Sequence, residues 1–116
     1  MKSIFEFEEL YIHRSFVDMR KGINGLAAIV KEEMGLELKS SSLFVFCNEP
    51  RTRMKILYFD HSGFAIWLKR LEDSKFAWPK KYELETISIS SKDMALVLDG
   101  INIFSRFEEV HFDHLI

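Results

Sequence analysis

The sequence predicts an α+β fold, in which an antiparallel meander of about four to six strands is flanked by two helices, at about residues 18–34 and 91–99. Three observations support this prediction. The length of 116 residues suits one compact domain. Apolar residues make up 47% of the chain and aromatic residues 14%, which is enough for a core. Several short apolar runs, separated by turn residues, lie between two segments with helical periodicity. We therefore expect residues 1–116 to form a single domain.

The first helix is predicted from a stripe of apolar residues that follows a short strand at residues 11–16. Asp18 is the expected cap of this helix, and Gly35 is a natural C-terminal stop. The spacing i, i+3, i+4, i+7 and i+11 predicts one buried helix face, made by Ile23, Leu26, Ala27, Val30 and Met34.

The start of this helix departs from the usual preferences. Arg20 and Lys21 directly follow Asp18, although the positive end of the helix dipole favours acidic residues. Gly22 and Gly25 come next, and each glycine costs about 1 kcal/mol relative to alanine inside a helix. With Ile29 they form a second stripe of small residues, which predicts that another backbone segment approaches this helix closely.

The middle of the chain contains apolar runs of strand length separated by turns. The first turn contains Pro50, and Pro79 ends the fourth run. Both faces of these strands are apolar in places, so we expect either that helices cover one side and a partner the other, or that the sheet curls on itself. The runs are residues 43–47, 53–60, 64–71, 75–78 and 86–90.

The second helix has a clear start and end. Ser90 and Asp93 form an [ST]-x-x-[DE] capping pattern, and Gly100 follows the last apolar residue. The C-terminal tail, residues 105–116, is interpreted as a short helix or an interaction segment.

The charge distribution is more informative than the net charge of −2. Residues 50–81 carry eight basic and three acidic side chains, whereas the flanking segments are acidic. Aromatic residues such as Trp67, Phe76 and Trp78 alternate with these cations. This pattern indicates either a nucleic-acid surface or a solvated sheet edge whose charges pair within the fold. The candidate DNA-contacting residues are Arg20, Lys21, Arg51, Arg53, Lys55, Lys69 and Arg70.

No recognisable catalytic or metal-binding pattern is present, so we expect a non-enzyme without cofactor or metal. Cys47 could pair with His61 or His13 as a nucleophile, but its apolar surroundings favour a core residue. His111 and His114 form an H-x-x-H pair that lacks further ligands, so solvated histidines are the better interpretation. A single cysteine and the lack of a long apolar run predict a cytoplasmic protein without a membrane span.

Several segments together resemble the insertion-sequence-66 family accessory protein, the second-open-reading-frame product called TnpB. Asp18-Met19-Arg20-Lys21-Gly22 is followed by Gly25-Leu26 at the family's spacing. Lys69-Arg70-Leu71-Glu72 is likewise followed by Phe76 and by Trp78-Pro79. The resemblance covers about residues 10–104. It implies a small protein of a bacterial mobile element that assists transposition, while a separate transposase carries out the strand-transfer chemistry.

Two mechanisms remain open within this resemblance. In the first, the start of the first helix, with Arg20 and Lys21, holds a phosphate of the element's double-stranded DNA, and the basic hairpin extends the contact. In the second, an aromatic sheet face and the tail dock onto the transposase or onto a second copy of the chain, and Arg20 pairs with Asp60 or Glu72. A first hairpin turn with less Arg and Gly than is usual in the family weakens the DNA mechanism.

Overall fold

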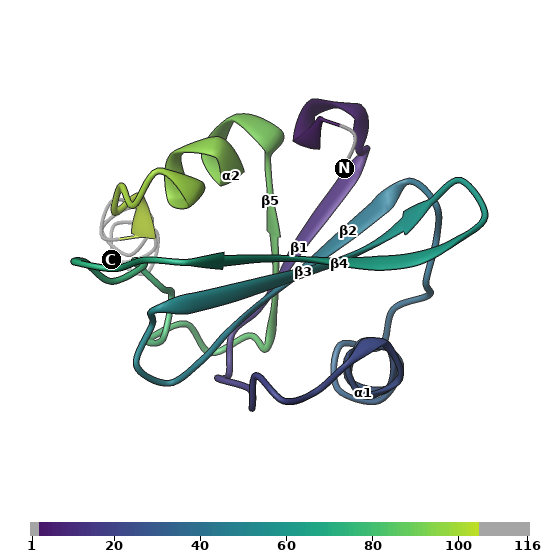
Figure 1. Ribbon diagram of the computed structural model, residues 1–116, viewed down its shortest axis with the longest axis horizontal. Helices are drawn as coiled ribbons and strands as arrows, with labels where there is room; N and C mark the ends of the chain where they lie inside the picture. Colours follow the sequence, from purple (N-terminus) through teal and green to yellow (C-terminus); the bar gives the residue numbers. More distant parts are fainter. Residues whose placement is uncertain (1–2, 105–116) are drawn as a thin grey trace, which may run out of the picture.

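The computed structural model describes residues 3–104. A five-stranded mixed sheet forms its centre, with one helix on one face and two shorter helices on the other (Figure 1). This arrangement confirms the predicted α+β class. The elements are the 3-10 helix η1 (Ile4–Glu6), β1 (Glu9–His13), α1 (Ile23–Glu32), β2 (Ser42–Cys47), β3 (Arg53–Asp60), β4 (Gly63–Arg70), β5 (Thr86–Ile89) and α2 (Ser91–Leu98).

The strand order β4-β3-β2-β1-β5 corrects the prediction of a purely antiparallel meander. Strands β2, β3 and β4 do form a meander, but β1 pairs with β2 in parallel, and β5 pairs antiparallel with β1. Parallel neighbours need a crossover connection, and α1 supplies it between β1 and β2. The first helix therefore belongs to a β-α-β unit.

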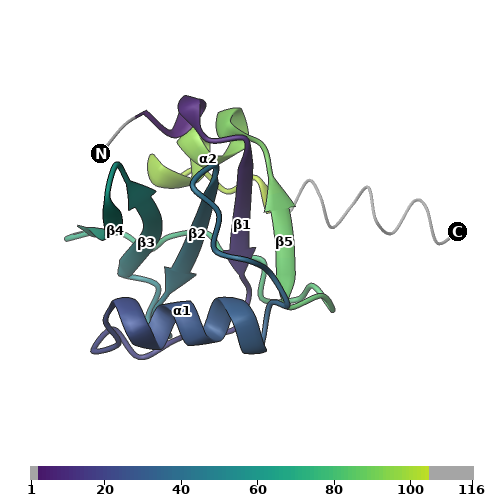
Figure 2. The same cartoon turned by 90° about the vertical axis from the view of Figure 1, so that its right-hand side faces the viewer.

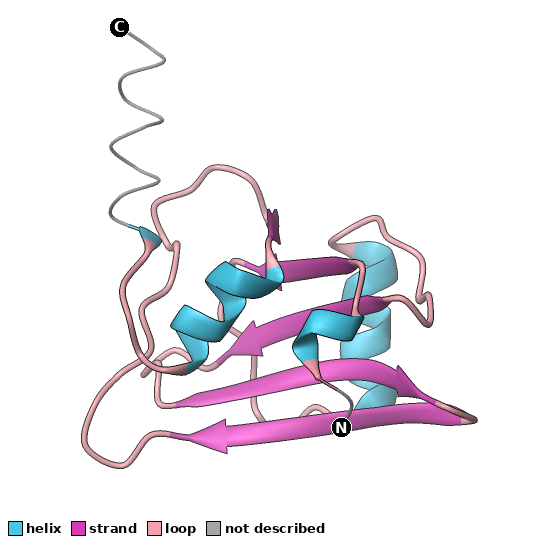
Figure 3. Ribbon diagram, turned by 90° about the horizontal axis from the view of Figure 1, so that it is seen from above, coloured by secondary structure: helices cyan, strands magenta, loops and turns pink. Residues whose placement is uncertain are grey.

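Both faces of the sheet are covered by helices at its centre, which explains why the central strand β2 lacks a polar side. All six residues of β2 are buried. On one face, Val45 and Ile56 pack in a core that includes Met94 of α2. On the other face, Phe46 packs against Leu26 of α1. Figure 3, seen from above, shows η1 and α2 over the strands and α1 behind them. Neither of the expected alternatives, a partner on one side or a curled sheet, is needed to bury the centre of the sheet.

Helix α1 begins five residues later than predicted. Gly22 is its N-cap, and no side chain caps its first turn. Asp18 instead accepts a hydrogen bond from the backbone N–H of Arg20 in the preceding turn, at 2.8 Å. Arg20 and Lys21 therefore lie outside the helix and do not oppose its dipole from within it.

The prediction that two glycines allow close backbone packing is wrong. A Cβ at Gly22 would meet no atom within 4 Å, and one at Gly25 would meet the Lys21 side chain at 3.2 Å. Ile29, the third member of the supposed stripe, is buried in the α1 core. Gly35 has a φ of 65° just after α1, so its role as a left-handed helix stop is confirmed.

The segment 75–78, predicted as a strand, forms a loop. Its backbone joins no strand ladder, although the Phe76 N–H donates to the Arg51 carbonyl oxygen at 2.7 Å. Phe76 and Trp78 are nevertheless buried, which explains why the segment has the apolar pattern of a strand. The predicted cap of α2 is confirmed, because the Ser90 side chain accepts a hydrogen bond from the Asp93 N–H.

Candidate nucleic-acid interface

The β3–β4 hairpin places two arginines directly opposite one another. Arg53 and Arg70 are partners in the antiparallel register, and both are exposed. Side chains of directly opposite residues lie on the same face of a sheet. Because side chains alternate along β3, this is also the face of Lys55 and of Leu57, which packs in the α1 core.

Lys55 joins this hairpin to the turn that precedes α1. Its ammonium group donates to the carbonyl oxygen of Met19 at 2.6 Å and to that of Lys21 at 2.8 Å. These two bonds bring Arg20 and Lys21 beside the hairpin, although 30 or more residues separate them from it in the sequence. We call the resulting set the basic surface: Arg20, Lys21, Arg53, Lys55 and Arg70.

Two carboxylates lie within the basic surface and partly neutralise it. Asp18 accepts from the Arg20 side chain at 2.6–3.1 Å, and Glu72 accepts from Arg70 at 2.8 Å. The side-chain hydrogen bond from Arg20, followed by that from its backbone N–H, lowers the pKa of Asp18 to about 2. Arg20 pairs with Asp18, and its side chain is 91% exposed rather than buried against an acid. The expected ion pair with Asp60 or Glu72 in the docking mechanism is therefore wrong. Among residues 3–104, the Arg53 guanidinium has no carboxylate partner.

Two of the candidate DNA-contacting residues lie away from the basic surface. The half-buried Lys69 points to the opposite face, where its ammonium group donates to the Leu98 carbonyl oxygen at the end of α2, at 2.7 Å. A cation at a helix C-terminus is stabilising. Arg51 adopts a φ of 61° in the β2–β3 turn and donates to the Phe76 carbonyl oxygen at 3.4 Å. The charged groups of Arg51 and Lys69 therefore bind backbone carbonyl oxygens within the fold.

The aromatic rings between the lysines belong mainly to the core. Phe76 is fully buried, and Trp78 is 4% exposed and donates from Nε1 to the Arg14 carbonyl oxygen at 2.8 Å. Trp67 is half-buried and packs against the same core, and Pro79 is buried. Phe76 and Trp78 therefore do not offer faces on which nucleic-acid bases would stack.

The cysteine considered as a nucleophile and the histidines considered as its partners form no catalytic pair among the residues that the structure describes. Cys47 is fully buried, and this burial raises the pKa of its thiol to about 12, so the expectation of a core cysteine is confirmed. Of its two conceivable partners, His61 is 96% exposed in the turn between β3 and β4, and His13 is buried at the end of β1. His111, His114 and the C-terminal tail lie outside the described residues.

Sequence reasoning missed the two contacts that assemble this interface. The cross-strand partnership of Arg53 with Arg70 depends on a register that the sequence does not specify. The clamp from Lys55 to the turn before α1 joins a side chain to backbone carbonyls, which leave no signal in the residue types. The fold thus presents an exposed basic hairpin beside an uncapped helix start, an arrangement suited to binding an extended anion rather than to chemistry in an enclosed pocket.

Comparison with known proteins identifies the family. The model of the family described as IS66 Orf2 like protein matches residues 8–107, so the chain belongs to this family of insertion-sequence accessory proteins. The uncharacterized protein y4hO of Sinorhizobium fredii is 32% identical over 93 residues, which cover 80% of each chain. The uncharacterized protein y4jC of the same organism is 30% identical over 86 residues, covering 74% of this chain and 73% of y4jC.

No solved structure matches this chain. Within residues 3–104, no helix is both long enough and apolar enough to cross a lipid bilayer. The family assignment from the sequence motifs is therefore confirmed by the family model, whereas the molecular mechanism has to be argued from the geometry.

Proposed function

We propose that this insertion-sequence protein assists transposition in the cytoplasm without catalysing a reaction, by contacting the backbone of double-stranded DNA through the basic surface. The observation that carries the proposal is the exposed cross-strand pair of Arg53 and Arg70. Like charges directly opposite one another destabilise a sheet, and Glu72 offsets the charge of only one of them. A polyanion bound across the hairpin would relieve this repulsion.

The start of α1 supports the same proposal. Its first turn carries no acidic residue and no side-chain cap, so its N–H groups and the positive end of its dipole favour an anion. Gly22, the N-cap, is exposed and open to close approach. Asp18 would release Arg20 to a phosphate, because both side chains are exposed to solvent.

A salt-dependent titration tests the proposal. Fluorescence anisotropy of a labelled duplex is measured against the full chain at several salt concentrations, together with the variants Arg53→Glu and Arg20→Glu. We expect the logarithm of the binding constant to fall linearly with the logarithm of the salt concentration, with a slope of about −0.9 for each phosphate contacted. Each variant should reduce both the affinity and the slope.

Lys92→Glu is the matched control. Lys92 is exposed on α2, which lies on the opposite face of the sheet from α1 (Figure 2), and the substitution makes the same change of charge. Equal losses in Lys92→Glu and Arg53→Glu would show that net charge alone matters. Absence of duplex binding at low salt would contradict the proposal.

Docking onto the transposase or a second copy of the chain is the alternative function, and the edge of the sheet favours it. Strand β4 has eight residues and a neighbour on only one side, so its outer backbone groups are open to pairing with another strand. Phe64 and Leu68 on this strand are 36% and 52% exposed. In this case Leu68→Lys would abolish complex formation with the transposase in the absence of DNA.

A further inference from the structure

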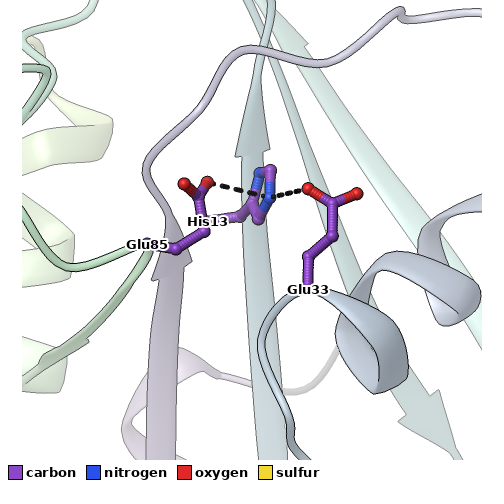
Figure 4. A group of neighbouring side chains, drawn as sticks. All are labelled: His13, Glu33 and Glu85. Carbon is purple, nitrogen blue, oxygen red and sulfur yellow. Dashed lines mark hydrogen bonds and ion pairs between the residues drawn. The ribbon is translucent and has the colours of Figure 1, made fainter.

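Three polar side chains from distant parts of the sequence converge at the end of β1. His13 is the last residue of β1, Glu33 is the C-cap of α1, and Glu85 immediately precedes β5. His13 Nε2 lies 3.2 Å from Glu33 Oε1 and 3.0 Å from Glu85 Oε1. Figure 4 shows the two carboxylates on either side of the His13 ring, both directed at the same nitrogen.

We propose that His13 Nε2, Glu33 Oε1 and Glu85 Oε1 form a binding site for a divalent transition-metal ion, of which Zn²⁺ fits the ligand set best. Zinc takes imidazole nitrogen and carboxylate oxygen at about 2.0–2.2 Å, commonly as three protein ligands plus water. In a tetrahedral site these bond lengths place neighbouring ligand atoms about 3.3 Å apart. The observed separations of 3.2 and 3.0 Å require only a small opening of the cluster.

The imidazole supplies an observation independent of the two acids. His13 is 1% exposed, and its Nδ1 has no hydrogen-bond partner. Both carboxylates are acceptors and both face Nε2, so without an ion the proton of a neutral His13 ring lies on Nε2. A single Nε2 proton can be donated with good geometry to only one carboxylate, whereas a cation between the three groups would contact all of them.

Glu85 is held in the orientation that a ligand needs. Its Oε1 accepts from the Ser15 N–H at 2.8 Å, and its Oε2 accepts from the Ser15 hydroxyl at 2.8 Å and from Arg14 at 3.1 Å. Burial by itself would raise the pKa of Glu85, but the hydrogen bonds from Ser15 and the nearby His13 and Arg14 lower it. Such outer contacts orient metal-binding carboxylates.

The position of Glu33 leaves the cluster open to solvent and favours a positive ion there. Its side chain is 53% exposed, so an ion can enter from solvent. As the C-cap of α1 it lies at the negative end of the helix dipole, which favours a cation. A bound ion would tie β1, α1 and the segment before β5 together. The ligands are 20 and 52 residues apart in the sequence, so no short motif indicates them.

Titration of the full chain with zinc tests this proposal. The protein is treated with EDTA, which is then removed, and ZnCl₂ is added in competition with a chromogenic chelator. We expect one bound ion per chain and a higher melting temperature in its presence. Loss of an outer-shell partner typically weakens metal affinity about 10–100-fold, so Glu33→Gln and His13→Asn, which remove ligands, should weaken it at least about tenfold.

The variant Glu33→Gln distinguishes a metal-binding site from a cluster held together by hydrogen bonds alone. The amide oxygen of Gln still accepts from a protonated Nε2, but it is a poor zinc ligand. Because Glu33 is half-exposed, this variant should fold even if His13→Asn does not, and circular dichroism checks both. Glu32→Gln, an exposed neighbour on α1, is the matched control and should bind like the wild type.

A double variant, His111→Asn/His114→Asn, controls for the second histidine pair in the sequence. Retention of the ion in this variant and its loss in Glu33→Gln would support the site. Failure of the wild type to bind zinc would overturn the proposal, as would wild-type affinity in Glu33→Gln or loss of binding only in the double variant.

Discussion

Replacement of Lys55 by methionine would test how the basic surface is assembled. Methionine keeps most of the aliphatic stem but removes the ammonium group, and with it the bonds to the Met19 and Lys21 carbonyl oxygens. Lys55 is half-buried, and the Met19 carbonyl bond is partly buried as well. The turn before α1 would then lose its direct hydrogen bonds to β3.

The expected loss of stability follows from these two bonds. A hydrogen bond to a charged group contributes about 1.5–3 kcal/mol, and the second bond from the same ammonium group adds less because the exposed Lys21 carbonyl can bind water instead. We therefore expect Lys55→Met to lower the free energy of unfolding by about 2–3 kcal/mol. For a chain of this size, each kcal/mol corresponds to about 3–5 °C in melting temperature.

Urea denaturation, followed by tryptophan fluorescence, measures this change. The midpoint should fall while the slope with urea stays constant, because the folded state remains compact. Lys31→Met, at an exposed position on α1, is the matched control and should change the stability by less than about 0.5 kcal/mol. A loss of less than about 0.5 kcal/mol in Lys55→Met would show that these two hydrogen bonds do not hold the turn against β3.

Three further predictions follow from individual contacts. Arg20→Ala should return the pKa of Asp18 from about 2 toward 3.8, as measured by NMR titration. Because the pKa of Asp18 is lowered in the folded state, this ion pair contributes to folding stability above pH 3.8, and the contribution is lost as the pH falls toward 2. Cys47, whose pKa is raised to about 12 by burial, should react with a thiol reagent only when the protein unfolds, and rapid labelling of the folded protein would contradict this. Leu26→Ala should lower the free energy of unfolding, measured by urea titration, by about 2–5 kcal/mol, because Leu26 is fully buried where α1 packs on the sheet. A loss of less than about 1 kcal/mol would show that the α1 core is loosely packed.

Local patterns in the sequence predicted most elements and several of their boundaries. The run at residues 43–47 forms most of β2, and residues 53–60 coincide with β3. The cap at Ser90 and the left-handed stop at Gly35 depend on a few neighbouring residues, so short-range chemistry is sufficient to specify them.

Local patterns failed where a distant segment completes the environment. Residues 75–78 have the apolar pattern of a strand, but Phe76 and Trp78 fill the core from a loop, in which the Phe76 N–H donates to the Arg51 carbonyl oxygen in the β2–β3 turn. The parallel pairing of β1 with β2 could not be read from either strand, since it depends on where α1 returns the chain. The predicted start of α1 is too early because Asp18 caps a turn rather than the helix.

The family, the α+β class and the basic segment in the middle of the chain can all be recognised from the amino-acid sequence alone. These properties depend on residue types and on their spacing along the chain, both of which are local. By contrast, the sequence does not show which cations share a surface or that His13, Glu33 and Glu85 form a cluster, because these contacts arise from the folding of the chain. Strand register and the crossover of α1 control these contacts, and both arise from packing between segments that lie tens of residues apart.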